Sequence, residues 1–348
     1  MEITERRKDD HIRLAMSKDV EFKTVRTGFE EVRLMYRSLP EGDYSSVSTE
    51  TVFAGERVGG PVIISGMTGG TSTARKINKR LAELSREYRL PIGVGSLRAL
   101  LENPNRLSTY SVVREITDMP IIGNIGVVQL KTYPPDDLLS VLDQIGGSVL
   151  AVHVNPEQEV IQPEGDTDFS GCLSAISDLV RAAGKIPVMV KGVGHGIDPI
   201  TAKRLLDVGV RYLDVAGAGG TSWTRIEYLR GRANVPGFEE VGLPTVISLV
   251  LAHRVGWGGG NRYLIGSGGV RSGIDVGKVL LLGGDYAGIA RPILTGEVNL
   301  GQLLLQLKTL MFLMGSPDIE TFKKVGDKGY VLTGWIKDWL DSWRESNE

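Results

Sequence analysis

Short apolar runs alternate with longer segments of helical spacing along most of the chain. The runs are rich in Val and Ile, and they cover residues 61–67, 91–96, 120–126, 148–155, 187–194, 212–217, 263–269 and 286–290. Apolar residues recur every three or four positions in 73–89, 105–117, 136–145, 170–183, 198–208, 243–255, 271–283 and 299–314. A nearly continuous apolar run predicts a strand buried on both faces, and the second pattern predicts an amphipathic helix.

Eight strand-helix units in succession predict an α/β fold in which a parallel sheet closes into a (β/α)8 TIM barrel. A doubly wound open sheet is the alternative, and it is less favoured because no GxGxxG motif opens the first helix. We expect one domain over residues 1–348. Residues 1–60 would form an N-terminal arm and cap, 61–314 the barrel, and 315–348 a C-terminal helical tail.

Two segments outside the regular units carry their own patterns. The connection 218–242 follows the sixth strand, and in a barrel a long loop at that end is a candidate lid. Trp335, Trp339 and Trp343 are four residues apart in the tail and therefore share one helical stripe. Such a stripe predicts packing against the barrel or against a second subunit. We expect a homo-oligomer, a tetramer or an octamer.

Composition narrows the class of protein. Hydrophobic residues make up 41% and charged residues 24%, and the formal net charge is -2, which is typical of a soluble globular protein and not of a general nucleic-acid or membrane-surface binder. The N-terminus is charged and has no secretory signal pattern. A single cysteine, Cys172, forms no internal disulfide and fits a reducing cytosol. We therefore expect a cytoplasmic protein without nucleic-acid or membrane partners.

Polar residues follow the predicted strands, at the end where barrel enzymes place their active sites. His153 and Asn155 are two apart on one strand and share a face. Gln158 and Glu159 come directly after them in the motif HVNPEQE. A core histidine is the alternative for His153 taken alone. A lone carboxylate such as Glu159 suits Mg²⁺, which completes its shell with water and substrate phosphate oxygens.

Cationic and glycine-rich segments indicate an anionic ligand. Lys191 ends an otherwise apolar strand and needs an anionic or dipolar partner unless its side chain reaches solvent at the rim. The stretch GSGGVRSG (266–273) places glycines ahead of a helix, where amide groups hold anions, and Arg291 could close over the same phosphate. A plain turn is the alternative. The charge run RRKDDH is interpreted as a solvated face, with an arm folded over the barrel mouth as the sharper option.

In their order along the chain, the segments RRKDDHI, ISGMTGG, VGSLR, GNIG, HVNPEQE, VKGVGHGI, DVAGAGGTSW and SGGVRSGIDV resemble the type 2 isopentenyl diphosphate isomerases, which are FMN-dependent barrel enzymes. The resemblance runs from about residue 6 to residue 295. The chain departs from the family pattern at Tyr36, Leu97, Gly192, His195 and Ala216.

The resemblance implies reversible conversion of isopentenyl diphosphate to dimethylallyl diphosphate in isoprenoid biosynthesis, with reduced FMN as acid and base, Mg²⁺, and NADPH as the reductant. The residues that would act in catalysis are Gln158, His153, Asn155 and Lys191, and Glu159 would bind the metal. FMN would contact Met67, Thr68, Gly69, Ser96, Asn124, Lys191, Thr221, Gly268, Gly269, Arg271, Ala290 and Arg291. The substrate would contact Arg7, Lys8, His11, Ser96, Arg98, His153, Asn155, Gln158 and Trp223.

Two other functions stay open. A net-redox FMN oxidoreductase acting on a related phosphorylated substrate would use the same barrel, and the substituted positions near the flavin motivate it. A non-catalytic flavin or phosphate binder would need neither Gln158 nor Glu159.

Overall fold

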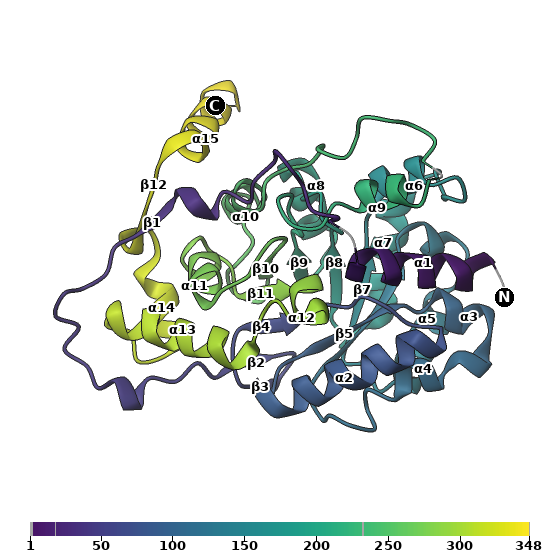
Figure 1. Cartoon of the computed structure of the whole chain (residues 1–348), viewed down its shortest axis with the longest axis horizontal. Coiled ribbons are helices and arrows are strands. Elements are labelled where there is room, and N and C mark those ends of the chain that lie inside the picture. Colours follow the sequence, from purple (N-terminus) through teal and green to yellow (C-terminus); the bar gives the residue numbers. More distant parts are fainter. Residues whose placement is uncertain (1–2, 18, 232, 348) are drawn as a thin grey trace.

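A closed barrel of eight parallel strands forms the centre of the computed structural model, which describes residues 3–17, 19–231 and 233–347, and the side chains of 8–17, 19–231 and 233–345 (Figure 1). The strands are β4 (Val62–Ile64), β5 (Ile92–Ser96), β6 (Ile121–Gly126), β7 (Val149–His153), β8 (Val188–Lys191), β9 (Tyr212–Asp214), β10 (Tyr263–Ser267) and β11 (Tyr286–Ile289). β11 pairs with β4 and closes the ring. The predicted TIM barrel is therefore confirmed, and the open sheet is excluded.

Helices surround the strands and bury their apolar faces against them (Figure 1). They are α2 (Ser72–Tyr88), α5 (Pro135–Gln144), α7 (Cys172–Ala183), α8 (Pro199–Asp207), α10 (Thr245–Arg254), α11 (Gly273–Leu281) and α13 (Leu300–Leu313). Each lies within two residues of a predicted helix. Among the described residues, no helix combines the length and the apolar composition needed to span a bilayer.

The predicted helix over 105–117 is wrong. The chain there forms two short pieces, η3 (Pro104–Arg106) and α4 (Ser108–Ser111), after the short helix α3 (Arg98–Glu102). Asn103 is extended, and its side chain caps a new turn that Pro104 begins. Tyr110 then turns into the core, where its hydroxyl donates to the carbonyl of Ser96 over 2.7 Å. Tertiary contacts thus override the helical spacing.

An aromatic layer closes the amino end of the barrel. The hairpin β2 (Thr51–Phe53) and β3 (Glu56–Val58) inserts Phe53, which is fully buried, with its ring centroid 5.2 Å from Tyr212 and 5.1 Å from Tyr286. Tyr212 and Tyr286 are the first residues of β9 and β11, so the hairpin covers that end. Burying a Phe side chain contributes roughly 1.5–3 kcal/mol. The carboxyl end of the barrel is left for the site.

Helical segments gather over the carboxyl end. They are α1 (Ile3–Ser17), α6 (Pro156–Ile161), α9 (Trp223–Leu229) and α12 (Arg291–Thr295), with η4 (Val128–Lys131). α1 contacts α9 and α12, and Leu14, Val20 and Ile226 form a small apolar cluster beneath it. The solvated interpretation of RRKDDH is wrong for Lys8 and His11, because both line the pocket below. The predicted lid, residues 218–242, contains α9 in its first half.

The segment that follows the N-terminal arm packs with the C-terminal elements at one extremity of the molecule, on the opposite side from the N-terminus (Figure 1). β1 (Val32–Leu34) pairs antiparallel with β12 (Tyr330–Leu332), next to η1 (Phe29–Glu31), α14 (Ile319–Val325), η5 (Gly326–Gly329) and α15 (Gly334–Asn347). η2 (Tyr44–Ser46) lies against α13 through Tyr44. The three Trp side chains of α15 are partly buried against the core, as predicted. Ile336 and Leu340 of the same helix are more deeply buried, at 0% and 2% exposure.

Candidate functional site

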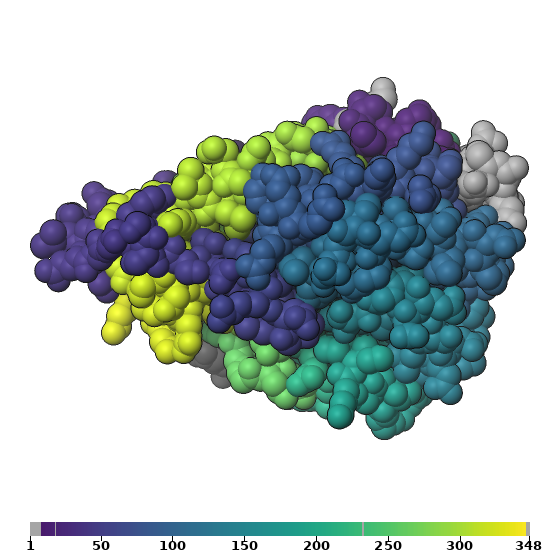
Figure 2. Space-filling view, turned by 90° about the horizontal axis from the view of Figure 1, so that it is seen from below, coloured from purple at the N-terminus to yellow at the C-terminus, as the bar shows by residue number. Residues whose placement is uncertain are grey.

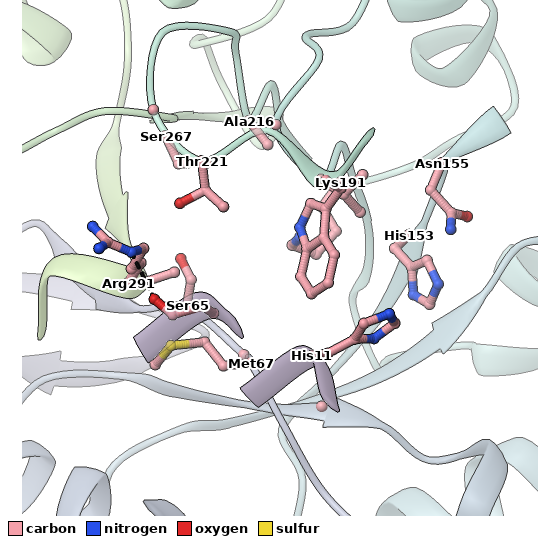
Figure 3. A pocket seen from close by; sticks show the side chains of 18 of the residues that line it. His11, Ser65, Met67, His153, Asn155, Lys191, Ala216, Thr221, Ser267 and Arg291 are labelled. Carbon is pink, nitrogen blue, oxygen red and sulfur yellow. Dashed lines mark hydrogen bonds between the residues drawn. The ribbon is translucent and has the colours of Figure 1, made fainter. Parts of the chain in front are cut away.

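One pocket of about 280 Å³ opens at the carboxyl ends of the strands. Figure 3 shows Lys191, His153 and His11 extending into the same space, with Thr221, Ser65 and Arg291 on its other side. The predicted site residues that line it are Lys8, His11, Met67, Thr68, Gly69, Ser96, Arg98, Asn124, His153, Asn155, Gln158, Glu159, Lys191, Thr221, Trp223, Gly268, Gly269, Arg271, Ala290 and Arg291. The side chain of Arg7 lies outside the described part of the chain. The predicted polar strand ends therefore meet on one rim.

Neighbouring strands fix the imidazole of His153. Its Nδ1 lies 3.0 Å from Oδ1 of Asn124, because β6 and β7 run side by side and both side chains face the barrel interior. An amide oxygen only accepts, so this contact is a hydrogen bond in the tautomer that carries a proton on Nδ1.

The turn after β7 orients Gln158 and Glu159. Asn155 is the N-cap of α6, and its amide donates to Oε1 of Gln158 (3.0 Å) and to Oε1 of Glu159 (2.9 Å). Oε2 of Glu159 accepts from the amide of Gln162 (2.7 Å) and from the backbone N–H of Asp166 (2.7 Å). Both oxygens of Glu159 thus accept hydrogen bonds from uncharged amide donors.

Glu227 is a site residue that the sequence reasoning missed. It is fully buried on α9, and its Oε1 lies 2.8 Å from His11 Nε2 and accepts from Gln158 Nε2 over 3.2 Å. Burial acts to raise the pKa of Glu227, but the hydrogen bond from His11 and the neighbouring Arg230 lower it to about 2. Trp223, Glu227 and Arg230 have helical spacing, which is the signal that could have revealed it.

Two glycine-rich turns, one at Gly220 and one at Gly268 and Gly269, line the opposite side of the pocket with main chain that carries no side chains. Gly268 and Gly269 have φ of 99° and 71°, which favours glycine, and a Cβ on Gly268 would come within 2.1 Å of the Gly217 carbonyl oxygen. A Cβ on Gly220 would come within 2.5 Å of the Gly269 amide nitrogen. The two turns can therefore pack closely only as glycines, and the backbone N–H groups of such turns suit an anion.

Both predicted phosphate arginines are paired with a carboxylate that the sequence reasoning missed. Glu21 lies in the same pocket, where Arg271 donates to its Oε1 and Arg291 approaches the same oxygen at 3.0 Å. Arg291 also donates from Nε to the carbonyl of Ala15 (2.8 Å) at the end of α1. These contacts hold the N-terminal arm against Arg271 and Arg291.

The remaining predicted cations are also held by protein groups. Lys8 donates to the carbonyl of Gly69 over 2.9 Å. Arg98 pairs with Glu102 (2.8 Å) and Asp166 (2.9 Å). Both cations are therefore bound to protein oxygens at the rim of the pocket.

The positions that depart from the family pattern lie in different surroundings. Leu97 is fully buried in the apolar core, and Tyr36 is 65% exposed on the segment after β1. Ala216 lines the pocket with a φ of 38°, a conformation that costs strain in a residue with a Cβ. The buried His195 lies with Nδ1 2.6 Å from the carbonyl oxygen of Val241 and anchors the 218–242 segment.

Comparison with known proteins gives relatives over nearly the whole chain. An isopentenyl-diphosphate delta-isomerase of Methanothrix thermoacetophila is 39% identical, covering 97% of this chain and 96% of its own. The protein of the same name from Halobacterium salinarum is 38% identical, with 99% and 98% coverage. No family model matches the chain.

Solved structures with the same fold are more distant in sequence. A flavocytochrome b2 with pyruvate bound superposes with a TM-score of 0.66 at 17% identity, covering 93% of this chain and 82% of its own. A mandelate oxidase with benzaldehyde gives 0.64 at 17% identity, covering 92% and 96%. These structures share the barrel architecture.

Proposed function

This chain belongs to the isopentenyl-diphosphate delta-isomerase family and is an isomerase, and we propose that it acts by the type 2 mechanism. In this proposal it interconverts isopentenyl diphosphate and dimethylallyl diphosphate with reduced FMN and Mg²⁺, in cytoplasmic isoprenoid biosynthesis, with NADPH as the reductant. One observation carries the proposal: Lys191, Gln158 and Glu159 line a single pocket together with two glycine turns.

The pocket fits FMN. Its phosphate end would rest on the bare backbone of the two glycine turns, next to Arg271 and Arg291. A mandelate oxidase of similar fold has been observed with an FMN adduct. The residues that would hold the cofactor are Met67, Thr68, Gly69, Ser96, Asn124, Lys191, Thr221, Gly268, Gly269, Arg271, Ala290 and Arg291. When bound, reduced FMN supplies a group that can give and take a proton at carbon.

Glu159 fits a magnesium ion shared with a diphosphate. Among the described residues, no cluster of three or more His, Cys, Asp or Glu side chains is arranged as a metal cage, so the ion would rest on one carboxylate, water and phosphate oxygens. The amides of Asn155 and Gln162 orient that carboxylate, as outer partners do for metal ligands. Lys8, His11, Arg98 and His153 would contact the phosphates, and Arg7 would join them by resemblance alone.

The chain's own side chains orient the reacting carbons and exclude water. Gln158 is fixed from both sides, since its oxygen accepts from Asn155 and its amide donates to Glu227. His11 joins α1 to the same carboxylate and lies edge-on to Trp223, with ring centroids 5.2 Å apart. Closing α1 over the mouth would shield a carbocation-like state from water. Lys191 would stabilise negative charge on the flavin ring.

The test is anaerobic turnover. Purified protein reduced with dithionite, with FMN and Mg²⁺, should interconvert the two diphosphates to the same equilibrium mixture from either side. Gln158→Ala and Glu159→Gln should each lower kcat/KM by about 100-fold or more, as expected when a positioning or metal contact is lost. Absence of interconversion by the reduced, FMN-loaded protein would overturn the proposal.

A flavin oxidoreductase is the second candidate, because the solved structures that share this barrel include a mandelate oxidase. That function would consume NADPH in stoichiometric proportion to product. The isomerase would use NADPH only to reduce its flavin at the start.

A further inference from the structure

Asp214 is a buried carboxylate in the pocket wall that the family resemblance did not assign. It ends β9, is 4% exposed, and lines the same pocket as Lys191. The two residues are register partners on adjacent parallel strands. Residues in register on such strands point to the same face of the sheet. The carboxylate and the ammonium group therefore share the barrel interior.

The hydrogen bonds around Asp214 favour its ionised form. Its Oδ1 accepts from the hydroxyl of Ser267 (2.6 Å) and from the backbone N–H of Ala216 (3.2 Å). A charged acceptor with two donors is stabilised relative to the protonated acid. The strand β10 thus supplies, through Ser267, a donor that holds the negative charge in place.

Lys191 has its own local restraint. Its ammonium group donates to the carbonyl of Gly192 over 2.6 Å. The titratable groups that border it are His153, its register partner on β7, Asp214 on β9, and His11 across the mouth. Of these, Asp214 is the carboxylic acid.

The charges of Lys191 and Asp214 each offset part of the free-energy cost of burying the other. Burial holds the pKa of Lys191 below its ordinary value, and the charge of Asp214 acts against that shift. Burial holds the pKa of Asp214 above its ordinary value, and the charge of Lys191 and the hydrogen bond from Ser267 act against that shift. Removing the carboxylate would leave the desolvation of Lys191 without its main opposing effect.

We propose that Asp214 is a positioning residue for the flavin: its buried carboxylate, held by Ser267, keeps Lys191 charged so that an ammonium ion faces the bound ring. The assignment deepens the proposed function and rests on it for the identity of the ligand. The state of Lys191 itself can be measured without any cofactor.

Competitive acetylation of the cofactor-free protein across a pH series tests the charge of Lys191 directly. The exposed Lys185 on the same chain serves as internal reference for the reagent. In Asp214→Asn the midpoint pH for labelling Lys191 should fall by about one unit or more, a roughly tenfold gain in its unprotonated fraction. Asp285→Asn, the same change at the amino end of the barrel, should leave that midpoint unchanged.

Ser267→Ala keeps the protein's charges and removes one donor to the carboxylate, so it should shift the labelling midpoint in the same direction by less. This milder variant keeps the assignment testable if Asp214→Asn unfolds. An unchanged midpoint in both variants would overturn the assignment.

In the FMN-loaded protein, the flavin midpoint potential is an independent measurement. Two explanations for the role of Asp214 predict shifts of that potential in opposite directions. If Asp214 acts only through its own charge, replacing it with Asn makes the pocket more positive and raises the flavin midpoint potential. If it keeps Lys191 protonated, the replacement removes a cation from the ring and lowers that potential. We expect the lower potential, and a higher one would contradict the assignment. Failure to take up FMN would overturn the proposed function instead, and the labelling result would still decide the role of Asp214.

Discussion

Three helices meet on the carboxylate of Glu227. His11 comes from α1, Gln158 from α6 and Arg230 from the C-cap of α9, the helix of Glu227 itself, and each contributes a hydrogen bond or ion pair to it. A fully buried carboxylate is stable only when paired and hydrogen-bonded. Glu227 thus joins the arm, the lid and the residue expected over the reacting carbons, although it projects from none of the barrel strands.

Replacing Glu227 with Gln should weaken this junction. The neutral amide loses the charge that pairs with His11 and Arg230 while keeping its size. Losing a charged hydrogen bond costs about 1.5–3 kcal/mol, so we expect kcat/KM to fall roughly 10- to 100-fold. Steady-state kinetics should attribute most of the loss to kcat, since Gln158 would be mispositioned. A variant with full activity would show that the junction does not orient the site.

The same residue makes stability depend on pH. Its pKa is lowered from 4.5 to about 2 in the folded chain, so its contribution is fully present above pH 4.5 and is lost as pH falls toward 2. The full contribution is on the order of 3 kcal/mol. Urea unfolding at pH 6 and pH 3 should show a smaller acid loss in Glu227→Gln than in the unchanged protein. Equal losses would contradict this assignment.

At the scale of elements, the N-terminal arm is attached at both sides of the pocket. His11 joins it to α9 and α6, and Glu21 joins the chain after α1 to the loops that follow β10 and β11. Barrel strands were predictable because their apolar runs carry the signal locally. The packing of α1 was not predictable, because the sequence of a highly charged helix does not show which of its sides contacts the rest of the protein.

Neutralising Glu21 should release the two arginines toward an anion. We expect Glu21→Gln to bind FMN several-fold more tightly, because the carboxylate no longer competes for Arg271 and Arg291. Isothermal titration with FMN measures the affinity. Glu297→Gln is the matched control, since Glu297 pairs with the same Arg291 but is not part of the pocket lining. Weaker FMN binding by Glu21→Gln alone would contradict competition.

The C-terminal helix α15 is held by its aliphatic residues more than by its tryptophans. Leu340→Ala removes a side chain that is 2% exposed and should lower the free energy of unfolding by about 2–5 kcal/mol. Lys337→Ala, on the exposed side of the same helix, should change it by less than about 0.5 kcal/mol. Denaturant unfolding of both variants gives the comparison, and equal effects would show that α15 adds little to the fold.

At the scale of the whole molecule, the location of the site was predictable, because barrel enzymes place their active sites at the carboxyl ends of the strands. Not every residue of the site was predictable in this way. Residues at the strand ends could be found because a parallel barrel brings those ends together. Asp214 also ends a strand, so the run YLDVAG carries the same signal as the segment around Lys191. Glu21 and Glu227 come from segments whose position depends on the finished fold, and only the helical spacing around Glu227 gives a local signal for either of them.

One extremity of the molecule exposes apolar side chains. Figure 2 shows the segment after β1 beside the C-terminal elements at that end. Met35, Tyr36 and Leu39 are 56%, 65% and 75% exposed there. Clustered exposed apolar residues mark interaction surfaces. The expected homo-oligomer remains a proposal, and this surface is where we expect its subunits to meet.

Light scattering of the purified chain should therefore give the mass of a tetramer or octamer of 37.7 kDa subunits. Leu39→Glu should lower that mass, because it places a charge in the contact. Ile200→Glu, at another exposed apolar position on α8, should not. A monomeric mass for the unchanged protein at micromolar concentration would contradict the proposal.

The central claim is that this pocket uses reduced flavin to move a proton without net oxidation of the substrate. Its most direct test is the number of product molecules formed per reducing equivalent in an anaerobic sample with FMN, Mg²⁺ and excess isopentenyl diphosphate. We predict many turnovers per equivalent, with the flavin spectrum still that of the reduced form at the end. One product per equivalent, with the flavin left oxidised, would contradict the account.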